Sequence, residues 1–295
     1  MRLLLIYTLC LTLFSACETP PDPAYVDKLM KWRSDRTDFL KSEEGFINLA
    51  GLYWFNEGMN TLGSAETGDV ILPADFPAQL ANIEWFADLA IISQVTDKQL
   101  LIDGQQVTQD TIYGDGEPKA LSWGSYRFYV IKRADKLGLR VKNYDHPRLK
   151  EALEIPYYPI DEDWVIEGKF EPYGPPKTLM IQNVVGLTYP VKCPGRLVFE
   201  IAGETYSLDP SMDGDQFYIT FGDETNGEET YGAGRYLYAN PPDENGNVVL
   251  DFNKAYNPPC AFTEYATCPL PPSQNRLAFS ITAGEKDFHW DDADH

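Results

Sequence analysis

One acidic stretch of the sequence concentrates groups that could do chemistry. From Leu197 to Gly234 there is no Lys or Arg. The stretch carries nine acids, which are Glu200, Glu204, Asp209, Asp213, Asp215, Asp223, Glu224, Glu228 and Glu229. Carboxylates from adjoining loops can chelate Ca²⁺, but no segment here matches a calcium-loop template. Acidic hairpin tips in water explain the same residues, so we expect no metal ion or cofactor, with a calcium site as the alternative.

Arg235 is the first base after this stretch, and it has two interpretations. A lone arginine in a carboxylate-rich sheet can lock the fold by pairing with Asp223 or Asp251, or it can hold an anionic ligand. Two carboxylates can also divide the acid and base roles of a hydrolase without a histidine. Asp223, Arg235 and Asp251 are therefore the catalytic candidates, and a satisfied buried network is the alternative.

The motifs of the common enzyme classes are missing from the sequence. It has no G-x-S-x-G nucleophile elbow, no H-E-x-x-H helix and no phosphate loop that ends in Gly-Lys-Ser or Gly-Lys-Thr. Its three histidines are His146, His289 and His295. A histidine-based zinc site is therefore not expected.

An irregular segment from Asp251 to Pro272 mixes aromatic residues, amides and prolines without periodicity. Long irregular loops often form binding or catalytic surfaces. Aromatic rings beside amides could stack on the face of a sugar. The ligand-binding candidates on and beside this segment are Tyr231, Arg235, Asn253, Tyr256 and Asn257.

The N-terminus predicts export. Arg2 precedes an apolar run from Leu3 to Phe14, which is long enough for a signal peptide and too short to cross a bilayer as a helix. With the next residues, Ser15-Ala16-Cys17, the end of this run resembles the lipobox of bacterial lipoproteins. We therefore expect residues 1–16 to be a signal peptide.

The same resemblance implies that Cys17 is lipidated and that residues 17–23 form a tether. Glu18 follows the cysteine in place of the aspartate that is associated with inner-membrane retention. We therefore expect the lipid to anchor the protein to the outer membrane. A soluble secreted protein with an unmodified Cys17 is the alternative.

Processing leaves three cysteines, because Cys10 departs with the signal peptide and Cys17 takes the lipid. In an oxidising envelope Cys260 and Cys268 are the disulfide candidates, since a short Pro-bounded loop could bring them together. Free packed thiols, Cys193 included, are the alternative. A metal site is less favoured because zinc prefers four Cys or His ligands at short spacing.

Hydrophobic periodicity predicts a mainly β protein with one N-terminal amphipathic helix. Asp22-Pro23 is typical of a helix start, and apolar residues recur at three- and four-residue steps over residues 24–41. Beyond Gly45, short apolar runs alternate with turn signals such as Asn245-Gly246. Because no helical segments separate these runs, they favour antiparallel sandwich or barrel-like sheets over a βαβ fold.

We expect residues 42–288 to form one β-rich body and residues 289–295 a frayed tail. A Pro-rich stretch at 145–163 could divide this body into two β units. The predicted strands are 46–55, 69–72, 90–95, 99–102, 126–131, 137–141, 165–170, 178–183, 196–201, 204–208, 217–221, 236–238 and 248–252.

Composition excludes one class of partner. The chain has 295 residues and is 43% hydrophobic, so it can bury a sizeable core. Its 24 Lys and Arg against 45 Asp and Glu give a net charge of -21. A surface that acidic repels phosphate backbones, and we expect no nucleic acid as a partner.

Several short sequence motifs in the C-terminal third resemble those of one family. They are TYGAGRYL at 230–237, DFN at 251–253, AYNPPCAF at 255–262, CPLPP at 268–272, NRL at 275–277 and AGE at 283–285. These motifs resemble the bacterial and archaeal domain-of-unknown-function family 1684. The resemblance is dense over about 217–285 and extends back to about Gly45. The resemblance implies no activity, cofactor or ligand, but it singles out polar positions. These are Asp223, Thr225, Tyr231, Arg235, Asp251, Asn253, Tyr256, Asn257 and the two cysteines Cys260 and Cys268.

Together these features predict a lipoprotein of the cell envelope that is held at the membrane by its N-terminal lipid. We expect its β body to bind a small molecule or a saccharide. A hydrolase that uses Asp223 and Asp251 with Arg235 is one alternative. The other alternative is a structural or interaction lipoprotein, in which the polar residues of these motifs only hold the fold.

Overall fold

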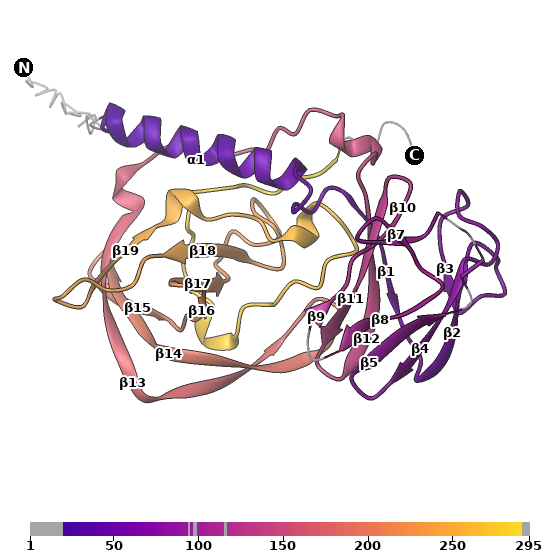
Figure 1. The fold of residues 1–295 in the computed structure, drawn as a ribbon. Coiled ribbons are helices and arrows are strands. Elements are labelled where there is room, and N and C mark those ends of the chain that lie inside the picture. The colour runs from indigo at the N-terminus through magenta and orange to yellow at the C-terminus, as the bar shows by residue number, and fades with distance from the viewer. Residues whose placement is uncertain (1–19, 94, 97–98, 115–116, 291–295) are drawn as a thin grey trace, which may run out of the picture.

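The computed structural model describes residues 20–93, 95–96, 99–114 and 117–290 (Figure 1). The described chain is mainly β, with antiparallel sheets and one α-helix near the N-terminus, which confirms the predicted fold class. The signal peptide and Cys17 lie outside the described residues, so export and lipidation stay predictions. Within the described residues, no helix combines the length and the apolar character that a membrane span needs.

Helix α1 spans Pro23–Lys41. Its N-cap is Asp22, whose carboxylate accepts a hydrogen bond from the backbone N of Ala24 at 3.0 Å, and Pro23 fills the first helical position. Leu29 and Leu40 are buried. Figure 1 shows the helix running along one side of the C-terminal half of the molecule, so its inner face can contribute side chains to a site there.

Among the described residues, 49–143 form two six-stranded sheets around one hydrophobic core. The first sheet runs in the order β1 (Leu49–Trp54), β12 (Lys136–Asn143), β11 (Tyr126–Arg133), β10 (Leu121–Trp123), β6 (Leu101–Ile102) and β7 (Gln105–Gln106). The second runs β3 (Val70–Ile71), β2 (Gly58–Gly63), β4 (Ala81–Phe86), β5 (Leu89–Ser93), β8 (Gln109–Gly114) and β9 (Glu117–Pro118). Phe128 and Val130 of β11 and Leu139 and Val141 of β12 belong to the core, so the residues between them point to the other face.

Residues 165–251, all of them described, form a four-stranded and a three-stranded sheet around a second core. The larger sheet runs β15 (Glu204–Leu208), β14 (Thr188–Ile201), β13 (Val165–Gln182) and β19 (Asn247–Asp251). The smaller runs β16 (Ser211–Asp213), β17 (Gln216–Phe221) and β18 (Arg235–Ala239). Among the described residues, no strand of this unit pairs with a strand of the first, and the segment between the units includes the stretch 145–163.

Two strand predictions were wrong at the longest hairpin. The sequence suggested separate strands at 165–170 and 178–183, whereas β13 is continuous over 18 residues. Prolines in its middle argue against a strand, but the register against β14 shifts between Pro172 and Lys177, and this irregularity accommodates them. β2, β4 and β8 were not predicted. In β2, Gly58 and Asn60 are poor strand formers, and the ladder to β4 holds them in the sheet.

After β19 the chain forms no further strand among the described residues and wraps around the second unit. Its 3₁₀ helices are η3 (Phe252–Lys254), η4 (Pro259–Ala261) and η5 (Ser273–Asn275), and η1 (Pro147–Leu149) and η2 (Glu162–Trp164) lie in the connection between the units. Isolated bridges join Asn183 to Pro269, Gly222 to Arg276 and Tyr236 to Tyr256. The irregular segment that the sequence singled out is therefore tied to the sheets beneath it.

Candidate functional site

Arg235 lies in a buried network of hydrogen bonds. Its Nη2 donates to Asp223 Oδ2 at 2.8 Å and to the carbonyl of Ile281 at 2.8 Å, and its Nη1 donates to the carbonyls of Ala283 and Glu285. Neither side chain of the Arg235–Asp223 pair is exposed to solvent. The structure thus places Arg235 in a buried network, which was the alternative to a ligand-holding arginine.

Asp251 has different partners from Asp223. Its carboxylate accepts a hydrogen bond from Tyr25 Oη of helix α1 at 2.8 Å and pairs with Lys254 Nζ at 2.9 Å. Asp223 is occupied by Arg235 and by the backbone and hydroxyl of Thr225. A two-carboxylate hydrolase needs both groups free to face one cavity. That arrangement is not formed, because each carboxylate is held by its own structural partners.

The amides among the candidates also hold the chain in place. Asn253 is fully buried. Its side-chain amide donates to the carbonyl of Asp161 at 2.7 Å and accepts from the backbone N of Asp161. Asn257 is fully buried too and donates to the carbonyl of Lys286 at 2.7 Å. Tyr231 Oη donates to the carbonyl of Cys260 at 3.2 Å. Among the described residues, no three His, Cys, Asp or Glu side chains cluster as metal ligands would.

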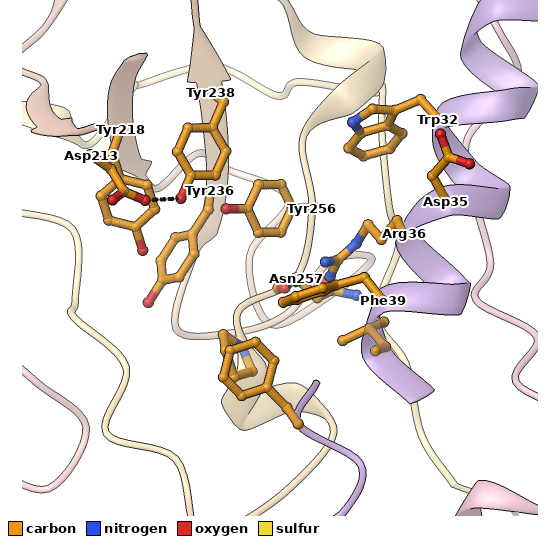
Figure 2. A pocket seen from close by; sticks show the side chains of 13 residues that line it. Trp32, Asp35, Arg36, Phe39, Asp213, Tyr218, Tyr236, Tyr238, Tyr256 and Asn257 are labelled. Atoms are coloured by element: carbon orange, nitrogen blue, oxygen red, sulfur yellow. Dashed lines mark hydrogen bonds between the residues drawn. The ribbon is translucent and has the colours of Figure 1, made fainter. Parts of the chain in front are cut away.

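A cavity of about 510 Å³ lies between helix α1 and the sheet β16-β17-β18. Trp32, Arg36 and Phe39 of the helix form one wall. Four tyrosines form the opposite wall, namely Tyr218 of β17, Tyr236 and Tyr238 of β18, and Tyr256 of the loop after η3. Figure 2 shows these side chains facing one another across the space. We call this cavity the tyrosine pocket.

The four rings pack in a regular way. Tyr238 and Tyr256 are nearly parallel, with ring centroids 6.1 Å apart and an interplanar angle of 10°. Tyr236 meets Tyr218 and Tyr256 edge to face at centroid distances of 5.2 and 5.8 Å. Aromatic pairs favour these geometries, so each ring fixes its neighbours. Tyr238 is 37% exposed and presents its ring at the mouth of the pocket.

Arg36 reaches from the helix across the pocket floor. Its guanidinium lies 4.4 Å from the ring centroid of Tyr256 and forms a two-pronged pair with the fully buried carboxylate of Glu285. Its Nη2 also donates to the carbonyl of Asn257 at 2.8 Å. The hydrogen bonds of Arg36 within the described part of the chain use its Nε and Nη2. Because Glu285 neutralises the guanidinium, the pocket carries no net positive charge from it.

The hydroxyl groups of the pocket stay protonated at neutral pH. Burial, followed by the hydrogen bond from Tyr238 Oη to Asp213 Oδ2 at 2.5 Å, raises the pKa of Tyr238 to about 12. Burial also raises the pKa values of Tyr218, Tyr236 and Tyr256 well above their ordinary value. Neutral phenols can donate and accept hydrogen bonds, so the pocket combines flat apolar faces with adaptable polar groups.

Of the binding candidates, the structure brings only Tyr256 and Asn257 to this pocket. Sequence reasoning missed the other tyrosines, although a signal was present. Tyr236 and Tyr238 are two residues apart on one strand and therefore lie on the same face, and Tyr218 is the cross-strand partner of Tyr238. Nothing local in the sequence indicated that Trp32 and Arg36 would lie opposite them.

The predicted disulfide is absent. Cys260 and Cys268 are free and adjacent, with the backbone N of Cys260 donating to Sγ of Cys268 at 3.0 Å. The hydrogen bond from the Cys268 thiol lowers the pKa of Cys260, whereas burial raises that of Cys268. Cys193 is a third free thiol, fully buried, and burial raises its pKa to about 11. The loop therefore places two thiols together without a bond between them.

The part of the chain that carries the four pocket tyrosines matches a known protein family. Residues 151–286 match the sequence model of the family described as "Protein of unknown function (DUF1684)". This part of the chain is similar to that family, and we call it the DUF1684 segment. The DUF1684 segment contains all four tyrosines, both loop thiols and Glu285, while helix α1 and the first β unit lie outside the match.

Two solved structures resemble parts of the chain. One is the solution NMR structure of an uncharacterized protein of Haloarcula marismortui, 28% identical, with a TM-score of 0.40 over 48% of this chain and 80% of that one. The other comes from a study of phosphothreonine-dependent FHA domain interactions and is 14% identical, with a TM-score of 0.19 over 31% of this chain and 92% of that one. Neither similarity is close enough to support a functional argument. A search of the curated proteins found no match.

Proposed function

We propose that this protein is a lipoprotein of the cell envelope that binds a small hydroxyl-rich ligand, such as a saccharide, in the tyrosine pocket. The observation that carries the proposal is the convergence of four tyrosines with Trp32 and Arg36 around one cavity of about 510 Å³. This volume falls within the range of small-molecule sites, roughly 300 to 1,000 Å³.

The chemistry of the wall favours a sugar over a purely apolar ligand. The parallel rings of Tyr238 and Tyr256 offer faces on which a pyranose can stack. Hydrogen-bonding side chains of both kinds also line the pocket, including the carboxylate of Asp213 and the guanidinium of Arg36. Rings that other rings already hold lose little entropy when a ligand orders them.

Binding is favoured over catalysis at this site. Asp223, Arg235 and Asp251 do not line the tyrosine pocket. The two acids that do, Asp35 and Asp213, are both exposed to solvent, and Asp35 pairs with Lys31 one helical turn away. A general acid usually works in a site that is shielded from water, and neither of these carboxylates is shielded.

The binding part of the proposal is tested on residues 18–295, which is the mature chain without its lipidated Cys17. A thermal-shift screen against monosaccharides and oligosaccharides selects a ligand, and calorimetry then gives its Kd. Tyr238→Ala should weaken binding at least tenfold, since a stacked aromatic contact is lost. The control is Phe86→Ala, which removes an exposed aromatic ring from the first β unit. A panel without a saccharide hit, or equal Kd values for the two variants, would favour a structural or interaction lipoprotein.

The envelope part is tested separately in a bacterial host. The full chain should incorporate an alkyne-tagged fatty acid and sediment with outer membranes. Cys17→Ser should abolish the label and release the protein. Label that persists in Cys17→Ser would contradict lipidation at Cys17, whatever the pocket binds.

A further inference from the structure

We infer that the junction between the two β units is a binding site for a phosphate-type oxyanion, held by Arg133, Arg140 and Thr267. The inference stands apart from the saccharide proposal, because Arg133, Arg140 and Thr267 do not line the tyrosine pocket.

The first β unit presents cations on the face that points away from its core. Arg133 ends β11, and Arg140 lies in β12 between the core residues Leu139 and Val141. Since side chains alternate along a strand, Arg140 points toward the second unit. It is only 8% exposed, so the junction has removed a guanidinium almost completely from water.

Both guanidiniums converge on one hydroxyl. Arg133 Nε donates to Thr267 Oγ1 at 3.0 Å, and Arg140 Nη2 approaches the same oxygen at 3.5 Å. Thr267 belongs to the irregular segment of the second unit, next to Cys268. Two positive charges therefore meet at a neutral group, which is an unfavourable arrangement by itself.

Carboxylates do not balance these charges. Among the ion pairs of the described residues, none includes Arg133 or Arg140, although the chain has a net charge of -21. Nε of Arg140 is buried and has no hydrogen-bond partner. Burial, and then the positive charge of Arg140, lower the pKa of Arg133. A pair of guanidiniums without an acidic partner, of which Arg140 is buried and Arg133 half-buried, indicates an anion site in an acidic protein.

The junction also has space for an anion. A cavity of about 140 Å³ is lined by both arginines, Thr267 and Cys268. A wider cavity of about 550 Å³ shares Arg133 and Thr267 with it and adds Lys132 and Tyr189 at its wall. Two guanidiniums fit the charge of a phosphate dianion better than that of a single carboxylate, and the hydroxyl of Thr267 can donate to a third oxygen.

The anion site and the tyrosine pocket are neighbours. The cavity of about 140 Å³ and the tyrosine pocket share Phe46, Tyr218, Tyr236 and Pro259 in their walls. The phosphate could thus come from two sources: free inorganic phosphate, or the phosphate group of a ligand whose body enters the tyrosine pocket.

The test uses the mature chain and inorganic phosphate, with sodium chloride of equal ionic strength as the reference. Phosphate should raise the Tm of the wild type and bind saturably in calorimetry. Arg133→Gln should weaken phosphate binding at least tenfold, and Thr267→Val should weaken it less. Lys28→Gln is the matched control, because it removes one positive charge from an exposed position on helix α1 and should leave the Kd within twofold.

The sign of the stability change separates an anion site from a structural arginine. In chloride, Arg133→Gln should not lower the Tm, because the substitution relieves repulsion from Arg140. In phosphate, the same variant should fall below the wild type. Arg140→Lys, which keeps the charge and loses the planar fork, should reproduce the loss of phosphate affinity. A Tm lowered equally in both salts, or no saturable phosphate binding by the wild type, would overturn the inference.

A second probe, glucose 6-phosphate, distinguishes the two sources. Equal Kd values for the two probes would identify a site for free phosphate. Tighter binding of the sugar phosphate, with the gain lost in Tyr238→Ala and the remaining affinity lost in Arg133→Gln, would identify one ligand that spans both cavities. If Tyr238→Ala changes the Kd of neither probe while Arg133→Gln still weakens both, the result would count against the saccharide proposal and leave the anion site intact.

Discussion

The ion pair between Arg235 and Asp223, with an Nη2 to Oδ2 distance of 2.8 Å, is fully buried, and both residues belong to the DUF1684 segment. Arg235 begins β18, and its Nη1 and Nη2 also donate to the backbone carbonyls of Ala283 and Ile281. One side chain thus joins a sheet strand, the turn at Asp223 and the last irregular stretch of the chain.

Removal of one partner of this pair should destabilise the fold strongly. Arg235→Met leaves the Asp223 carboxylate buried and uncompensated, which typically costs about 3 to 5 kcal/mol. Lys31→Gln is the control, because it breaks an exposed helical pair that is worth less than about 1 kcal/mol. Urea unfolding at neutral pH measures both. A loss in Arg235→Met no larger than that in Lys31→Gln would show that the buried pair does not stabilise the fold.

Two glycines with almost the same backbone conformation should respond differently to a methyl group. Gly284 has a φ of +80°, and a Cβ there would lie 2.4 Å from the carbonyl oxygen of Ala255. Gly186 has a φ of +81° with open space around it. Gly186→Ala should cost roughly 1 kcal/mol from the left-handed conformation alone, and Gly284→Ala clearly more. Equal losses in denaturant unfolding would mean that the chain near Ala255 moves aside.

The three described thiols should differ in reactivity. The hydrogen bond from Cys268 lowers the pKa of Cys260, whereas burial raises the pKa values of Cys193 and Cys268. The thiolate is the nucleophile, so iodoacetamide should alkylate Cys260 first in the native protein. Peptide mass spectrometry over time gives the three rates. Faster labelling of Cys193, which is fully buried, would indicate that the second unit opens before Cys260 reacts.

The stability of the protein should fall at alkaline pH, in part through the tyrosine pocket. The pKa of Tyr238 is about 12 in the folded chain against 10.0 for an ordinary tyrosine. The folded state therefore holds this proton more tightly, and the resulting stabilisation is complete below pH 10 and is lost as the pH rises toward 12. Tyr238→Phe cannot ionise and should lose less stability over that window. Parallel curves of unfolding free energy against pH for the two proteins would contradict this.

Some features follow from short-range patterns in the amino-acid sequence. The cap at Asp22-Pro23 and the apolar spacing predict helix α1, because capping and periodicity act over a few residues. The same reasoning explains why most strands were found and why β13, interrupted by prolines, was not found as one element. The family resemblance likewise depends on short contiguous motifs, and it was confirmed over residues 151–286.

The tertiary structure decided which of the conspicuous residues are free to bind. Arg235 was the best candidate from the sequence, yet long-range contacts enclose it with Asp223 and with carbonyls about 46 to 50 residues away. Arg133 was not a site candidate from the sequence, yet it contacts Thr267 across a separation of 134 residues and has no acidic partner among the described ion pairs. Burial and charge balance depend on which distant segments pack together, and local patterns carry no information about that packing.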